Sequence, residues 1–188
     1  MTGALWVPVV LGGLVGVWAI AIWNRFVRLG QHLKESWADI DVELKRRYEL
    51  IPNLVATVKG YARHEREVLE RVLALRGRAL ANQGTPASQG GDETNLMLGV
   101  KQLFAVAEAY PELKADQHFR ELQKELALTE DRIAASRRFY NGNVRALAVM
   151  RRTFPTNLVG RLLGVEEPTY FELADESERV VPRVDLDR

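Results

Sequence analysis

No charged side chain precedes Arg25, although the chain carries 26 basic and 25 acidic residues. The stretch before it, from Gly3 to Trp23, is apolar apart from its glycines and one proline. As a helix it would rise about 1.5 Å per residue, or roughly 31 Å in all, close to the thickness of a bilayer's hydrocarbon core. Trp6 and Trp23 lie near its two ends, where indole rings favour the headgroup region. The sequence therefore predicts a transmembrane helix over residues 3–23.

A cleaved signal peptide is the alternative interpretation of this start. Residues 19–21 resemble a cleavage site. A signal peptide, however, needs a basic segment before its apolar run, and Met1 and Thr2 do not supply one. We therefore favour a permanent anchor. Arg25, Arg28 and Lys34 follow the span while no basic residue precedes it. The positive-inside rule then predicts a single-pass protein of the inner (cell) membrane, with its N-terminus outside and its body in the cytoplasm.

Composition excludes several functions for the body of the protein. The 188 residues include no cysteine, which excludes a disulfide scaffold and a cysteine-ligated metal site. The formal net charge is +1, without the basic excess that a dedicated nucleic-acid-binding protein needs. The length after the span is enough for one domain with its own core.

The body has the apolar spacing of helices, with hydrophobic residues recurring at steps of three and four and no sustained alternation typical of strands. We predict helices over residues 28–60, 64–82, 92–109 and 116–152, with a loop over 82–92 and Asp116 capping the last helix. Pro52 is predicted to kink the first helix without reversing the chain. Two short helices between two long ones predict an all-α fold, an antiparallel up-and-down four-helix bundle behind the transmembrane helix. The predicted parts are the span at 3–23, the bundle at 24–157, and a short amphipathic segment with a polar tail at 158–188.

Several motifs resemble those of the LemA family. They are WADIDVELKRRYELIPNLVATVKGYARHE at residues 37–65, YPELK at 110–114, LQKEL at 122–126, TEDRIA at 129–134 and FPTNL at 154–158. The resemblance implies a membrane-anchored, all-helical protein with an antiparallel bundle. It implies no established enzyme activity.

Polar residues on the two long helices form a candidate site. Glu130, Arg137 and Asn141 fall within about 40° of one another around a helix, at the edge of its apolar stripe. We expect Arg47 and Asn53 of the first long helix to meet them. Such a row is either a ligand pocket or a network that fixes the register of a bundle, and we favour the network because no nucleophile with a base and no pair of carboxylates in a cleft is visible.

A further acidic residue and a histidine lie near the break after Gly60. Glu65 is a candidate buried hydrogen-bond acceptor that would join the same network. His64 lacks a histidine four residues later, where Val68 stands, so the helical zinc-protease motif fails. We predict no catalytic residue, no metal ligand and no cofactor.

The anchor carries small residues at Gly12, Gly16 and Ala19, a spacing that lets membrane helices approach closely. Two basic clusters have two interpretations each. The cluster at 45–47 is either a solvated helix face or a contact with lipid or a partner. The arginines around the apolar run at 158–163 indicate either an amphipathic element lying on a membrane or a segment that closes one end of the bundle.

The combined interpretation is a non-enzymatic scaffold. The expected partners are membrane lipid and further copies of the chain, which would self-assemble to organise or remodel the membrane. The alternative is a membrane-tethered module that binds a protein partner for signalling or protein quality control.

Overall fold

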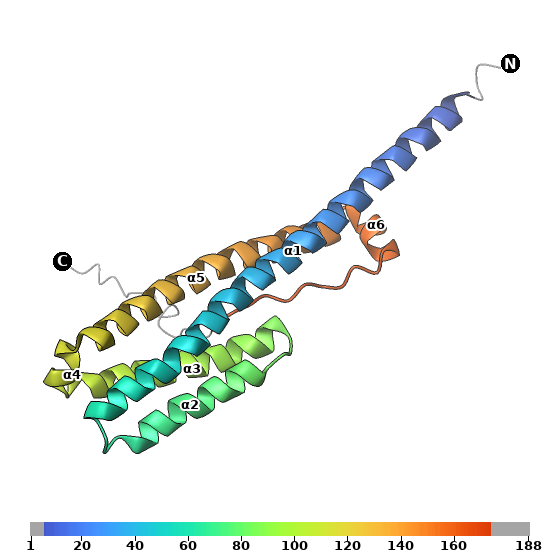
Figure 1. Cartoon of the computed structure of the whole chain (residues 1–188). Coiled ribbons are helices and arrows are strands. Elements are labelled where there is room, and N and C mark those ends of the chain that lie inside the picture. The colour runs from blue at the N-terminus through green and yellow to red at the C-terminus, as the bar shows by residue number, and fades with distance from the viewer. Residues whose placement is uncertain (1–5, 174–188) are drawn as a thin grey trace, which may run out of the picture. The chain divides into compact units, whose positions relative to one another are not determined.

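The computed structural model describes residues 6–173, and within this range the chain forms six helices and no strand (Figure 1). The helices are α1 (Trp6–Tyr61), α2 (Arg66–Ala81), α3 (Pro86–Glu108), α4 (Pro111–Ala115), α5 (Gln117–Arg152) and α6 (Thr156–Leu162). The predicted all-helical class is confirmed over these residues. The predicted polar tail from Ala174 lies outside them.

The chain divides into two compact units. The first unit contains the described residues up to Val42 together with Ala134–Tyr170, and the second contains Glu43–Ile133 and the residues from Phe171 onward. Helices α1 and α5 each contribute to both units.

Helix α1 joins the predicted span to the predicted first body helix without a break. No residue in its apolar window is buried, and α1 is long and apolar enough by length and composition to cross a membrane. Pro52 lies inside the helix, so the predicted continuity is confirmed. Ile51 and Leu54 beside the proline are buried, and this packing compensates for the backbone hydrogen bond that a proline removes.

The second unit is built around the helical hairpin of α2 and α3 (Figure 1). Gly99 of α3 lets the two helices approach closely, since a Cβ atom there would lie 2.8 Å from Cδ1 of Leu75 on α2. The core of this unit comprises apolar side chains from every long helix and one from the C-terminal segment, among them Leu44, Ile51, Leu54, Val58, Leu69, Val72, Leu96, Val100, Leu103, Leu122, Leu126, Ile133 and Phe171.

The predicted loop over residues 82–92 is wrong in its second half. Helix α3 begins at Pro86, because Thr85 caps it by accepting a hydrogen bond from the Ser88 backbone N–H and a proline suits the first helical turn. Asp116 does cap α5 as predicted, accepting from the backbone N–H of Phe119 at 2.7 Å. The short helix α4 lies between the predicted helices over 92–109 and 116–152.

The first unit gathers its apolar side chains around Phe26 of α1. Leu147 and Met150 of α5 are buried with it, and the partly buried residues packed against them are Ile22, Leu29, Leu33, Val159, Leu163 and Val165. The rings of Trp37 and Tyr140 lie 5.3 Å apart in the same unit. Helix α6 begins two residues before the segment predicted to be amphipathic and ends inside it.

Candidate functional site

The second unit contains a buried network of charged and polar side chains centred on Arg47 of α1. Arg47 is 1% exposed and donates from one terminal nitrogen to both carboxylate oxygens of Glu130 on α5, at 2.8 and 3.0 Å. Its other terminal nitrogen donates to Glu93 of α3, which is equally buried. The Tyr48 hydroxyl donates to the second oxygen of Glu93. One guanidinium thus neutralises carboxylates from two other helices.

A fourth helix joins the network through a backbone atom. The side chain of Arg76 on α2 donates from Nε to the carbonyl oxygen of Tyr48 at 2.6 Å. Because α1, α2, α3 and α5 all contribute, sliding any one of them along its axis would leave a buried charge or polar atom without its partner. Removing one partner of a buried ion pair is costly, because it leaves the other charge buried without compensation.

Burial and charge act in opposite directions on the two central groups. Burial lowers the pKa of Arg47, but the carboxylates of Glu130 and Glu93 outweigh it, and the pKa is raised overall. Burial also raises the pKa of Glu93, against smaller lowering effects from Arg47 and Tyr48. The guanidinium therefore stays charged, while ionised Glu93 depends on its two donors to remain buried.

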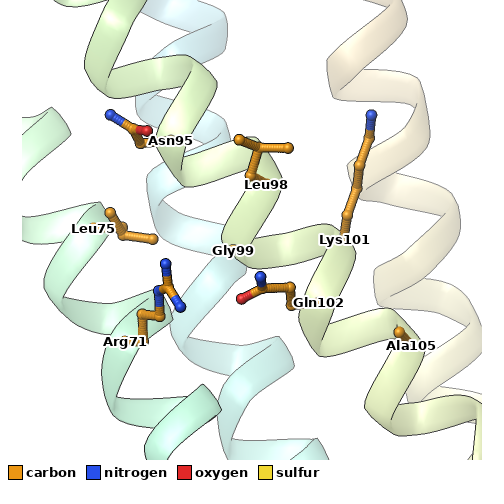
Figure 2. Close-up of a pocket in the computed structure, with 8 residues that line it drawn as sticks. All are labelled: Arg71, Leu75, Asn95, Leu98, Gly99, Lys101, Gln102 and Ala105. Atoms are coloured by element: carbon orange, nitrogen blue, oxygen red, sulfur yellow. The ribbon is translucent and has the colours of Figure 1, made fainter. Parts of the chain in front are cut away.

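A groove on the surface of the second unit runs between α2 and α3 and has a volume of about 370 Å³ (Figure 2). Arg71 and Leu75 of α2 line it, together with Asn95, Leu98, Gly99, Lys101, Gln102 and Ala105 of α3. Figure 2 shows Leu75, Arg71 and Gln102 around Gly99, where an added Cβ atom would meet Leu75. The lining carries two cations and no carboxylate. Across residues 6–173, no group of three or more His, Asp or Glu side chains is placed to hold a metal ion.

Comparison with known proteins decides the family, since the LemA family profile matches residues 36–186. The chain belongs to the LemA family. The resemblance predicted from the motifs is confirmed.

Relatives of this LemA-family chain include Protein LemA of Metamycoplasma hominis, 26% identical over 158 residues that cover 84% of this chain and 71% of the relative. Magnetosome protein MamQ 2 of Paramagnetospirillum magneticum is 24% identical over 175 residues, covering 80% of this chain and 64% of the relative. Magnetosome protein MamQ of Magnetospirillum gryphiswaldense is 22% identical over 189 residues, covering 86% and 70%. The chain thus spans less than two thirds of the length of MamQ 2. The names of these proteins carry no enzymatic activity.

The structure brings together two of the six residues predicted for the polar network, Arg47 and Glu130. Asn53 is exposed on α1, and Glu65 precedes α2 without capping it through its side chain. Arg137 and Asn141 are half-buried on the part of α5 that belongs to the first unit. A single network of all six residues stays a prediction.

Sequence reasoning missed Glu93 and Tyr48 as members of the network. A signal for Glu93 was available, since it lies three residues before Leu96 and seven before Val100, on the same helical stripe. The prediction of a loop up to Asp92 obscured it. A carboxylate on an otherwise apolar stripe requires a buried cation, and Arg47 supplies it.

The small residues of the anchor are accessible on α1. A Cβ atom added at Gly12 or Gly16 would meet nothing within 4 Å, and Ala19 is half-buried. This part of the LemA-family chain therefore has a row of residues with small side chains or none along one side of the helix.

Proposed function

We propose that this LemA-family protein is a non-enzymatic, membrane-anchored scaffold that self-assembles and organises or remodels the membrane. In this proposal the start of α1 crosses the inner membrane once, and the long helices form an antiparallel up-and-down four-helix bundle in the cytoplasm. The observation that carries the proposal is α1 itself. It runs unbroken from the exposed apolar start to the buried Arg47 network. One continuous helix therefore connects the contacts made by the body to the anchor.

Three further observations support a scaffold. Arg25, Arg28 and Lys34 directly follow the apolar stretch, as the positive-inside rule requires for a cytoplasmic body. Gly12 and Gly16 leave room for a second membrane helix. Relatives in Paramagnetospirillum magneticum and Magnetospirillum gryphiswaldense are named as magnetosome proteins.

The experiment that tests the scaffold is extraction of the full-length protein with its surrounding lipid, followed by mass measurement of single particles and electron microscopy. An ordered assembly of many copies is the expected result. A protein that stays monomeric at the density found in native membrane would contradict the scaffold, whereas its anchoring would still stand if the particles retained lipid.

The groove between α2 and α3 favours a second candidate, a partner-binding module for signalling or protein quality control. Arg71 and Lys101 line the groove, and its lining includes no carboxylate, which suits an acidic segment of another protein. A stoichiometric partner that co-purifies should be lost in Arg71→Glu with Lys101→Glu. It should be kept in the control pair Lys59→Glu with Lys114→Glu, which changes exposed lysines outside the groove. Loss in both pairs would contradict binding in the groove.

A further inference from the structure

Helix α6 has one apolar face that is packed and another that is exposed. On the packed face, Val159 lies against the cluster around Phe26, and Gly160 is so close that an added Cβ would lie 3.0 Å from Cζ of Phe26. On the exposed face, Leu158 and Leu162 are 50% and 87% exposed. Phe154, just before the helix, is 76% exposed. A seven-residue helix that shows two large apolar side chains to solvent, with a third just before it, has a surface to be covered.

The place where α6 docks determines what can cover that surface. Phe26 comes three residues after Trp23, the end of the apolar stretch, which corresponds to about 4.5 Å along the helix axis. Ile22, inside the apolar stretch, packs against the same cluster as Val159. All of these residues belong to the first unit. If α1 spans a membrane, α6 is therefore held at the level of the lipid headgroups.

The charges around α6 match an anionic lipid surface. Arg151 and Arg152 are paired with Glu167. Arg25 and Arg28 on α1 and Arg161 on α6 are exposed, and the described part of the chain offers them no carboxylate partner. Apolar side chains beside unpaired arginines are the composition of an element that lies in the interface of a bilayer.

We infer that α6 is a second membrane contact, an interfacial element that inserts Phe154, Leu158 and Leu162 at the acyl boundary while Arg25, Arg28 and Arg161 bind the phosphates of anionic lipids. The inference rests on the membrane anchoring in the proposed function and deepens it. An anchor alone leaves the chain free to rotate about the axis of α1. A second contact removes that freedom and gives the first unit a defined orientation relative to the membrane.

The absence of cysteine allows a direct test in the full chain, because one introduced cysteine can carry one fluorescent label. We would label Leu162→Cys, the control Leu98→Cys, and Val17→Cys in the apolar stretch. Each protein is placed in vesicles of phosphatidylcholine with phosphatidylglycerol. Two quenchers are compared, iodide in the water and a phosphatidylcholine whose acyl chain carries a nitroxide near the headgroup. All three positions are exposed, so the labels disturb no core.

The expected result is that iodide quenches the label at 162 several-fold less than the label at 98, and that the nitroxide lipid quenches it several-fold more. If the label at 162 is quenched by iodide and by lipid as the label at 98 is, while the label at 17 is quenched by lipid, the anchoring stands and the interfacial contact is wrong. If 162 is shielded from both quenchers, protein covers α6, a second copy of the chain for instance, and the inference is wrong. If 17 is open to iodide, the anchoring fails and the inference fails with it.

The charged part of the inference has its own variant. Quenching by the nitroxide lipid should fall when the Leu162→Cys protein also carries Arg25→Gln, Arg28→Gln and Arg161→Gln. It should fall similarly when the Leu162→Cys protein with its three arginines intact is placed in vesicles of phosphatidylcholine alone. The label at 17 should not respond to either change. Equal quenching at 162 under all conditions would overturn the role of anionic headgroups.

Discussion

Arg47 holds a full charge away from water, and its two carboxylate partners make that burial tolerable. Replacing it by alanine would leave Glu93 buried without its cation, so Arg47→Ala should reduce the free energy of unfolding by about 3–5 kcal/mol. The matched control is Arg46→Ala, whose half-exposed pair with Glu125 should contribute no more than about 1 kcal/mol. Urea unfolding of the full-length protein in detergent, followed by circular dichroism, measures both. Equal losses would contradict the central place of Arg47.

The capping residue Asp116 makes the stability of the fold depend on pH in the acid range. Its pKa is lowered from the ordinary 3.8 because the Phe119 backbone N–H, and then the Tyr61 hydroxyl, donate to the carboxylate. A lowered pKa means that the stabilisation is complete above the unfolded-state pKa and is lost as the pH falls through the folded-state value. Asp116→Asn keeps a cap but does not titrate, so its small deficit in urea midpoint at neutral pH should vanish in strong acid. Equal deficits at neutral pH and in strong acid would contradict this role of Asp116.

The meeting of Arg47 with Glu130 was within reach of the sequence, because both lie at the edge of apolar stripes on long helices. Glu93 and Arg76 were harder to foresee. The partner of Glu93 is distant in the chain, and Arg76 reaches a backbone carbonyl oxygen, which every residue offers and no side-chain pattern reveals. Apolar periodicity predicts which face of a helix is buried, but it does not say which polar groups meet across the core.

The helices themselves were largely predictable, since their apolar stripes persist over many turns. The start of α3 was not, because Gly90 and Gly91 have the composition of a loop. Gly90 has a tertiary reason to be glycine. A Cβ there would lie 2.3 Å from the carbonyl oxygen of Glu172, which belongs to the segment that brings Phe171 into the core. The helix therefore includes a glycine for the sake of a contact that is remote in sequence.

The two adjacent glycines of α3 should respond in opposite ways to the same substitution. Gly90→Ala must displace the backbone at Glu172 and should cost about 1–3 kcal/mol, as overpacking does. Gly91→Ala meets nothing within 4 Å and should stabilise the helix by up to about 1 kcal/mol. Urea unfolding measures whether each substitution lowers or raises the free energy of unfolding. Hydrogen exchange at Phe171 should accelerate in Gly90→Ala alone, and unchanged exchange there would contradict the role of Gly90.

At the scale of the whole chain, the charge-free start is the strongest indication of where the protein lies relative to a membrane. Assembly with other copies is a separate property. A helix that is long and apolar enough to cross a membrane, with no buried residue in its apolar window, suits membrane anchoring. Interfaces between copies depend on surfaces that a monomer leaves open. Within the proposed scaffold, the stripe of Gly12 and Gly16 is the surface where the absence of side chains would have a function.

Leucine at both positions would fill that stripe and hold two anchors apart. Gly12→Leu with Gly16→Leu should therefore shift the lipid-extracted protein from oligomers toward monomers, because membrane helices associate through close packing of small residues. Gly13→Leu is the matched control, since Gly13 is equally open but lies on a neighbouring face of the helix. Particle mass in native lipid reads out both variants. An oligomer that survives the double substitution would place the contact between copies on the body of the protein, and an equal loss with Gly13→Leu would show that bulk anywhere on the anchor is disruptive.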